Sequence, residues 1–142
     1  MEKIKNISPG NHVYYEIRTE KGFSDIHLCT IDHQDIKNFE EDPVKFNERH
    51  KPIPISEKWH NRFGVEKNGF DSFEYELPRK VNIRVKVVFT DDYVYLRQSN
   101  DGISLNDSLI TIWNKDVAGR YIYVHEWQNL YNSLTGEKLK KK

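Results

Sequence analysis

The C-terminal segment of the chain places the tightest limit on how it folds. Residues 121–139 begin with aromatic and β-branched side chains and then change to a helical pattern. Gly136 stands where a helix often ends on a residue with positive φ. The pattern predicts a strand that turns into a short amphipathic helix and closes the fold. The apolar residues that share one face of this helix are Val124, Trp127, Leu130, Tyr131 and Leu134.

The first fifty residues predict a β-hairpin followed by an acidic helical segment. His12–Arg18 is rich in β-favouring residues, and residues 20–22 make a hairpin turn into a second strand, residues 23–31. Residues 32–50 are acidic and compatible with helix, but Pro43 makes one continuous helix unfavourable. We expect a short helix, a break and a second helical turn.

Residues 51–64 predict an extended linker that leads into a short helix. Pro52 and Pro54 push the residues before them towards extended geometry. Ser56 is a favourable N-cap for a helix over residues 57–63, and Gly64 is its expected stop.

The remainder predicts an antiparallel β-meander. Residues 81–87 alternate strictly between β-branched and polar side chains. Asp91-Asp92 is a candidate turn, so residues 93–97 return antiparallel, with Lys86 opposite Arg97 and Val88 opposite Tyr95. Residues 100–102 form another turn signal, and residues 109–113 form another strand.

This order of elements predicts an α+β fold. We expect one domain over residues 1–142, in which residues 1–50 form the hairpin and acidic segment and residues 51–142 form the capped helix, the meander and the C-terminal helix. A twisted antiparallel sheet carries the short mid-chain helix and the C-terminal helix. The expected core residues are Trp59, Phe63, Val81, Ile83, Val85, Val87, Leu96, Ile112, Trp127, Leu130, Tyr131 and Leu134.

No motif in the chain indicates a reaction. Cys29 is the one cysteine, which excludes an internal disulfide and a thiolate zinc site, and the six histidines are dispersed. The sequence contains no nucleophile elbow and no phosphate-binding glycine loop. We therefore predict no catalytic residue, no metal and no cofactor, and expect the protein not to be an enzyme. A carboxylate pair assembled by the fold stays an open alternative.

The polar face of the hairpin at residues 81–97 is the first candidate binding surface. Basic side chains contact phosphates and tyrosines stack on bases, so single-stranded RNA is one possible ligand. Tyrosine and arginine are also frequent in protein interfaces, and an ordinary solvated face with acidic neighbours is the third reading. The residues of this surface are Lys80, Arg84, Lys86, Tyr93, Tyr95 and Arg97.

A second candidate surface lies on the polar side of the C-terminal helix. It consists of His125, Gln128, Asn129 and Asn132. These polar, largely uncharged side chains suit the docking of a partner. In the other reading they lie against a sheet edge and satisfy its backbone groups.

Two separated motifs resemble a family of small uncharacterised phage and prophage proteins of Bacteroidota-type hosts. The C-terminal motif is Tyr123-Val124-His125, Gln128-Asn129-Leu130-Tyr131 and Leu134-Thr135-Gly136-Glu137, and the mid-chain motif is Pro52-Ile53-Pro54-Ile55-Ser56-Glu57-Lys58-Trp59. Trp127 and Asn132 depart from the more leucine-like and apolar residues of the family pattern. The resemblance implies no reaction and no site residue.

The resemblance implies a biological role rather than a reaction. Small phage accessory proteins often act stoichiometrically against host defences, so we expect a non-enzymatic protein that binds and inhibits a host defence protein or ribonucleoprotein complex. An inhibitor of a CRISPR–Cas effector, an anti-CRISPR, is the concrete version. The alternatives are RNA or DNA binding through the 81–97 face, and a sponge or hydrolase for a signalling nucleotide.

No apolar stretch approaches the length of a membrane span, so we expect a cytoplasmic protein in the host cell that contacts no membrane. The oligomeric state stays open.

Overall fold

The protein contains two compact units. A computed structural model describes residues 3–22, 24–69, 71–78, 83–100, 103–114 and 122–142. The first unit consists of Met1–Pro54 and Tyr123–Lys140, and the second of Ile55–Ile122 and Lys141–Lys142. In the described residues, seven strands form two antiparallel sheets and four helices accompany them, which confirms the predicted α+β class.

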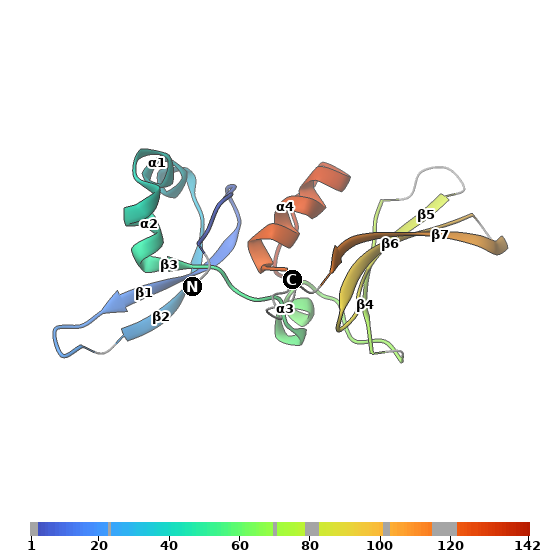
Figure 1. Cartoon of the computed structure of the whole chain (residues 1–142), viewed down its shortest axis with the longest axis horizontal. Coiled ribbons are helices and arrows are strands. Elements are labelled where there is room, and N and C mark those ends of the chain that lie inside the picture. The colour runs from blue at the N-terminus through green and yellow to red at the C-terminus, as the bar shows by residue number, and fades with distance from the viewer. Residues whose placement is uncertain (1–2, 23, 70, 79–82, 101–102, 115–121) are drawn as a thin grey trace. The chain divides into compact units, whose positions relative to one another are not determined.

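The first unit is built on a three-stranded sheet in the order β2-β1-β3 (Figure 1). Its small core includes Ile4, Val13, Ile31 and Phe46. Pro43 is the first residue of the second helix, so the predicted break at this proline is confirmed. The elements of this unit are β1 (His12–Arg18), β2 (Ser24–Thr30), α1 (His33–Glu41), α2 (Pro43–Arg49), β3 (His50–Lys51) and α4 (Val124–Thr135).

The last helix, α4, is attached to the start of β1 by a buried glutamine. The side-chain oxygen of Gln128 accepts a hydrogen bond from the backbone N–H of His12 at 2.8 Å. Its Nε2 donates to the backbone carbonyl oxygens of Gly10 and Leu139, both at 3.1 Å. Gly136 ends the helix with φ of 75°, as the sequence predicts.

The second unit is built on a four-stranded sheet in the order β4-β5-β6-β7 (Figure 1). Lys86 pairs with Arg97, and Val88 with Tyr95, so the register predicted for this hairpin is confirmed. The strand β4 is not predicted from the sequence. The elements of this unit are α3 (Glu57–Arg62), β4 (Phe73–Glu76), β5 (Ile83–Phe89), β6 (Tyr93–Asn100) and β7 (Ile103–Asn114).

The short helix α3 packs its aromatic side on this sheet. The ring of His60 stacks on Phe73 with 4.2 Å between ring centroids, and meets Phe89 edge-on at 4.7 Å. Ser56 is the N-cap residue, as predicted, but its side chain makes no capping hydrogen bond. The expectation of a bonded serine cap is therefore wrong, whereas Gly64 ends this region with positive φ as expected.

The structure confirms four of the predicted core side chains as buried. Trp59, Phe63, Val87 and Trp127 are each at most 2% exposed. Five others are only partly buried, namely Val85, Leu96, Ile112, Leu130 and Tyr131. Val81 and the side chain of Ile83 lie outside the described residues.

Leu134 is 40% exposed, so its prediction as a core residue is wrong. It lies seven residues after Trp127, at nearly the same angle around the helix but about 10 Å further along its axis. The buried residues of α4 are Val124, His125, Trp127 and Gln128, all in its first half. The helix therefore extends past the residues that bury its face.

The strands form two sheets where the sequence predicts one. In the first unit, β1 has β2 on one edge and β3 on the other, so both of its edges are filled by local partners. The β3 strand is two residues long and ends the acidic segment, where no alternating pattern marks it.

Among the described residues, no helix combines the length and the apolar character that a membrane span requires.

Candidate functional site

The first candidate surface is the polar face of the four-stranded sheet. Arg84 and Lys86 on β5 share this face with Tyr93, Tyr95 and Arg97 on β6, because paired antiparallel residues point to the same side. The rings of Tyr93 and Tyr95 lie 5.9 Å apart, and Tyr93 is 44% exposed. Lys80, the sixth predicted residue, lies outside the described residues.

The neighbouring strand places two acidic residues on the same face. Glu74 pairs with Val88 and Glu76 pairs with Lys86 in the β4–β5 ladder. The carboxylate of Glu74 also lies 3.6 Å from the ammonium of Lys86. The surface therefore carries acidic side chains on β4 beside basic side chains on β5 and β6. We call it the charged sheet face: Glu74, Glu76, Arg84, Lys86, Tyr93, Tyr95 and Arg97.

The second candidate surface, on α4, is largely buried. His125 is 3% exposed and Gln128 is 4% exposed. The hydrogen bonds of Gln128 and the 3.0 Å bond from Asn11 Nδ2 to Asn129 Oδ1 are used within the first unit. Only Asn132 is exposed. The prediction of a docking surface here is wrong for His125 and Gln128, and the alternative, that this side satisfies backbone groups, describes Gln128.

The first unit exposes apolar side chains on an edge strand. β2 pairs with β1 through seven consecutive residues and forms one edge of its sheet. Ile26 and Leu28, on one face of this strand, are 64% and 39% exposed. An edge of this kind can accept another strand, but its residues alone do not indicate which.

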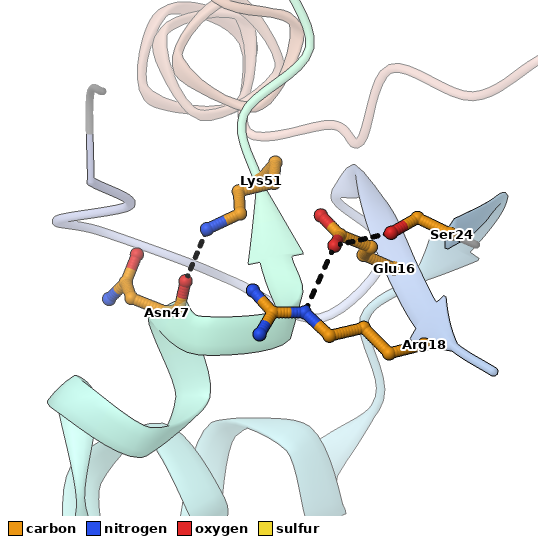
Figure 2. Close-up of polar contacts among 5 residues, drawn as sticks. All are labelled: Glu16, Arg18, Ser24, Asn47 and Lys51. Atoms are coloured by element: carbon orange, nitrogen blue, oxygen red, sulfur yellow. Dashed lines mark hydrogen bonds and ion pairs between the residues drawn. The ribbon is translucent and has the colours of Figure 1, made fainter. Parts of the chain in front are cut away.

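A polar network orders the surface beside this edge. Figure 2 shows the Glu16 carboxylate between Arg18 and Ser24, accepting from Arg18 Nε at 3.3 Å and from Ser24 Oγ at 3.0 Å. The hydrogen bond from Ser24, followed by that from Arg18, lowers the pKa of Glu16 below its usual value. Lys51 Nζ donates to the backbone carbonyl oxygen of Asn47 at 2.9 Å. These contacts fix side chains on β1, β2 and β3.

The second unit contains a hollow that the sequence analysis missed. Its volume is about 220 Å³, and His60 lies in its wall. The His60 ring is 3% exposed, and its Nδ1 lies 2.7 Å from the hydroxyl of Tyr75. Burial lowers the pKa of His60 to about 4, so its imidazole is neutral near pH 7. The lining residues are Ile55, Ser56, Glu57, His60, Lys67, Asp71, Phe73, Phe89, Thr90 and Asp91.

Two tight turns bring acidic residues to this hollow. In the turn after α3, Asp71 adopts φ of 56°, and its N–H donates to the carbonyl oxygen of Asn68. In the β5–β6 turn, Thr90 Oγ1 donates to the carbonyl oxygen of Tyr93 at 2.9 Å. The acidic residue Asp91 follows Thr90 directly. Asp91-Asp92 is a predicted turn, but no local pattern in the sequence relates that turn to His60.

The described residues contain no group of three or more histidine, cysteine or acidic side chains arranged to hold a metal ion. Cys29 is partly buried, and burial raises the pKa of its thiol above the usual value, which disfavours the reactive thiolate.

No protein-family model, no curated protein and no solved structure matches this chain.

Proposed function

We propose that this chain is a non-enzymatic accessory protein that binds a protein partner through the charged sheet face. The partner we propose is a component of a host defence system, with a CRISPR–Cas effector as the concrete version. The identity of that partner rests on the resemblance of the C-terminal and mid-chain motifs to phage and prophage proteins. The use of the sheet face rests on its chemistry.

The observation that carries the proposal is the acidic component of the face. The Glu74 carboxylate lies 3.6 Å from the ammonium of Lys86, and Glu76 is opposite the same lysine in the β4–β5 ladder. Adjacent acidic and basic side chains beside an exposed tyrosine suit a protein surface with complementary charges, where tyrosine and arginine often dominate the binding energy. The same carboxylates repel a phosphate backbone, so they favour protein over nucleic acid.

The proposal is tested with purified defence complexes and with infection. The protein is expected to co-purify with one effector complex and to protect a sensitive phage from that system. Replacing Arg84 with Glu and Tyr93 with Ala should remove both effects, whereas the control Lys37→Glu, an exposed site on α1, should leave both intact. Absence of binding to any complex together with absence of protection would overturn the proposal.

Direct nucleic-acid binding is the second candidate, because Arg84, Lys86 and Arg97 lie on one face beside Tyr95. A salt titration with single-stranded RNA separates it from the first. Phosphate contacts release counterions, so affinity for RNA falls steeply as salt rises, and replacing the three basic residues with alanine abolishes it. Binding to the protein partner that persists after nuclease treatment favours the first candidate.

Charge disfavours a signalling nucleotide in the hollow beside His60. Glu57, Asp71 and Asp91 line it together with one cation, Lys67. The net negative lining opposes the phosphates of a signalling nucleotide. A thermal-shift screen of cyclic nucleotides and oligonucleotides checks this directly, and stabilisation by any of them would revive that alternative.

A further inference from the structure

The hollow in the second unit carries more negative than positive charge. Among the described residues that line it, Glu57, Asp71 and Asp91 are acidic, and Lys67 is the one lysine or arginine. Lys67 Nζ lies 3.7 Å from Glu57 Oε2, and both side chains are well exposed, so this ion pair is weak. The charges of the two aspartates are left to attract a cation.

The wall of the hollow offers an aromatic and hydrogen-bonding surface. His60 is 3% exposed, and its ring stacks on Phe73 and meets Phe89 edge-on. Among the described residues, the only hydrogen bond of the His60 ring joins Nδ1 to the hydroxyl of Tyr75. This bond fixes the ring orientation and leaves Nε2 as the ring nitrogen that remains for a guest in the hollow.

Resting on the function proposed above, we propose that the hollow receives an arginine side chain of the protein partner. A guanidinium is planar, forms paired hydrogen bonds with carboxylates and packs on aromatic rings, so it matches Asp71, Asp91 and the Phe73–Phe89 wall. In the tautomer where Nδ1–H donates to the Tyr75 oxygen, His60 Nε2 accepts an N–H of the guanidinium.

The position of the hollow relates it to the charged sheet face. Thr90 and Asp91 belong to the turn that leads directly into Tyr93, and Thr90 Oγ1 is bonded to the Tyr93 carbonyl oxygen. A partner that contacts Tyr93 therefore lies within reach of the hollow. Arginine is a frequent anchor residue at the centre of protein interfaces.

The direct test is a titration of the whole protein followed by NMR. The probe is N-acetyl-arginine-N-methylamide, and the readouts are the His60 ring nitrogens and the amides of Thr90 and Asp91. We expect saturable shifts of these signals with the arginine derivative. The citrulline derivative, which has the same shape without the charge, should cause none at the same concentrations.

Variants locate the binding in the hollow. The double substitution Asp71→Asn with Asp91→Asn should weaken probe binding about tenfold or more. Asparagine also tolerates the left-handed backbone conformation of residue 71, so the turn is preserved. The matched control is Asp92→Asn, because Asp92 is exposed, adjacent in sequence and not part of the lining.

Several outcomes would overturn the inference: no shift with the arginine derivative, equal shifts with citrulline, stronger binding of the lysine derivative, or unchanged affinity of the double variant. The probe titration decides this inference without any partner. Co-purification decides the proposed function separately. A partner bound equally well by the double variant and the unsubstituted protein would reject the arginine pocket while leaving the proposed function intact.

Discussion

Two buried histidines, one in each unit, have similar exposure but different surroundings. His60 on α3 and His125 on α4 are both 3% exposed, and burial lowers the pKa of each to about 4. His60 is bonded to the Tyr75 hydroxyl and lines a hollow. The Nδ1 atom of His125 is buried and has no hydrogen-bond partner in the described part of the protein, although its ring stacks near Tyr123.

The difference separates two effects of burial on a polar residue. Removal from water fixes the protonation state of both imidazoles, since the charged form is penalised at either site. Whether the buried ring also stabilises the fold depends on its hydrogen bonds, because an unpaired buried nitrogen costs free energy that a bonded one does not. The hydrogen bond of His60 therefore contributes to the stability of the fold, whereas the unpaired nitrogen of His125 lowers it.

The lowered pKa values of the two histidines predict the largest effect, which is a loss of folding stability at acidic pH. Each folded-state pKa lies below the unfolded value of 6.5, so the unfolded chain binds more protons as pH falls. Stability is unaffected by these groups above pH 6.5 and decreases progressively down to about pH 4, by about 3 kcal/mol for each histidine. Urea denaturation between pH 4 and 7.5 measures this decrease.

Single replacements assign the acid effect to each site. His60→Leu and His125→Leu should each remove about 3 kcal/mol of the stability difference between pH 7.5 and pH 4. A pH dependence that both variants leave unchanged would mean that neither imidazole stays neutral in the folded protein.

A fully bonded polar residue on the same helix sharpens the comparison with His125. Gln128, one turn further along α4, makes three hydrogen bonds to backbone groups of His12, Gly10 and Leu139. Gln128→Leu leaves these backbone groups without their glutamine partner. It should lower the free energy of unfolding by about 3 kcal/mol at neutral pH. Chemical denaturation measures the loss.

The matched control for Gln128 is the next residue. The side chain of Asn129 accepts a hydrogen bond from Asn11 Nδ2 at a partly exposed position. Asn129→Leu should cost about 1 kcal/mol or less. Equal losses for the two variants would show that Gln128 does not hold α4 on β1.

Replacing either histidine with leucine should change the free energy of unfolding in opposite directions at pH 7.5, where both imidazoles are neutral. Leucine has a volume similar to that of histidine, so packing changes little. His60→Leu loses the bond to Tyr75 and should destabilise by about 1 kcal/mol, whereas His125→Leu removes an unpaired buried nitrogen and should stabilise by about 1 kcal/mol. Thermal unfolding of both variants decides; a loss at position 125 as large as that at position 60 would contradict the contrast.

The elements that the sequence predicted correctly are set by short-range patterns. Alternation in residues 83–87 and the turn at Asp91-Asp92 determine the β5–β6 register, and Gly136 determines the end of α4. The four-residue strand β4 was missed because its alternation is too short to distinguish from a loop.

The sites depend on contacts that no local pattern contains. Polar residues on a helix are assigned to solvent by periodicity, yet Gln128 bonds a backbone group 116 residues away. The hollow similarly combines the start of α3 with two turns around Asp71 and Asp91. The acidic residues on the charged sheet face were likewise hidden, because they belong to the missed strand β4.

Asp71 gives the smallest expected effect and tests whether the region around His60 has a function that the region around His125 lacks. Its φ of 56° places it in the left-handed region, which glycine occupies without steric cost. Asp71→Gly should raise stability by about 0.5 kcal/mol, because relief of strain is partly offset by the greater freedom of glycine in the unfolded chain. Asp71→Ala should instead lower it, since alanine lacks the short polar group that makes this conformation tolerable. If the hollow binds arginine, Asp71→Gly also weakens that binding, so stability and affinity change in opposite directions. A variant that is more stable and binds the arginine derivative as well as the unsubstituted protein would show that Asp71 serves the turn alone, which would remove the reason to treat the surroundings of His60 as a site.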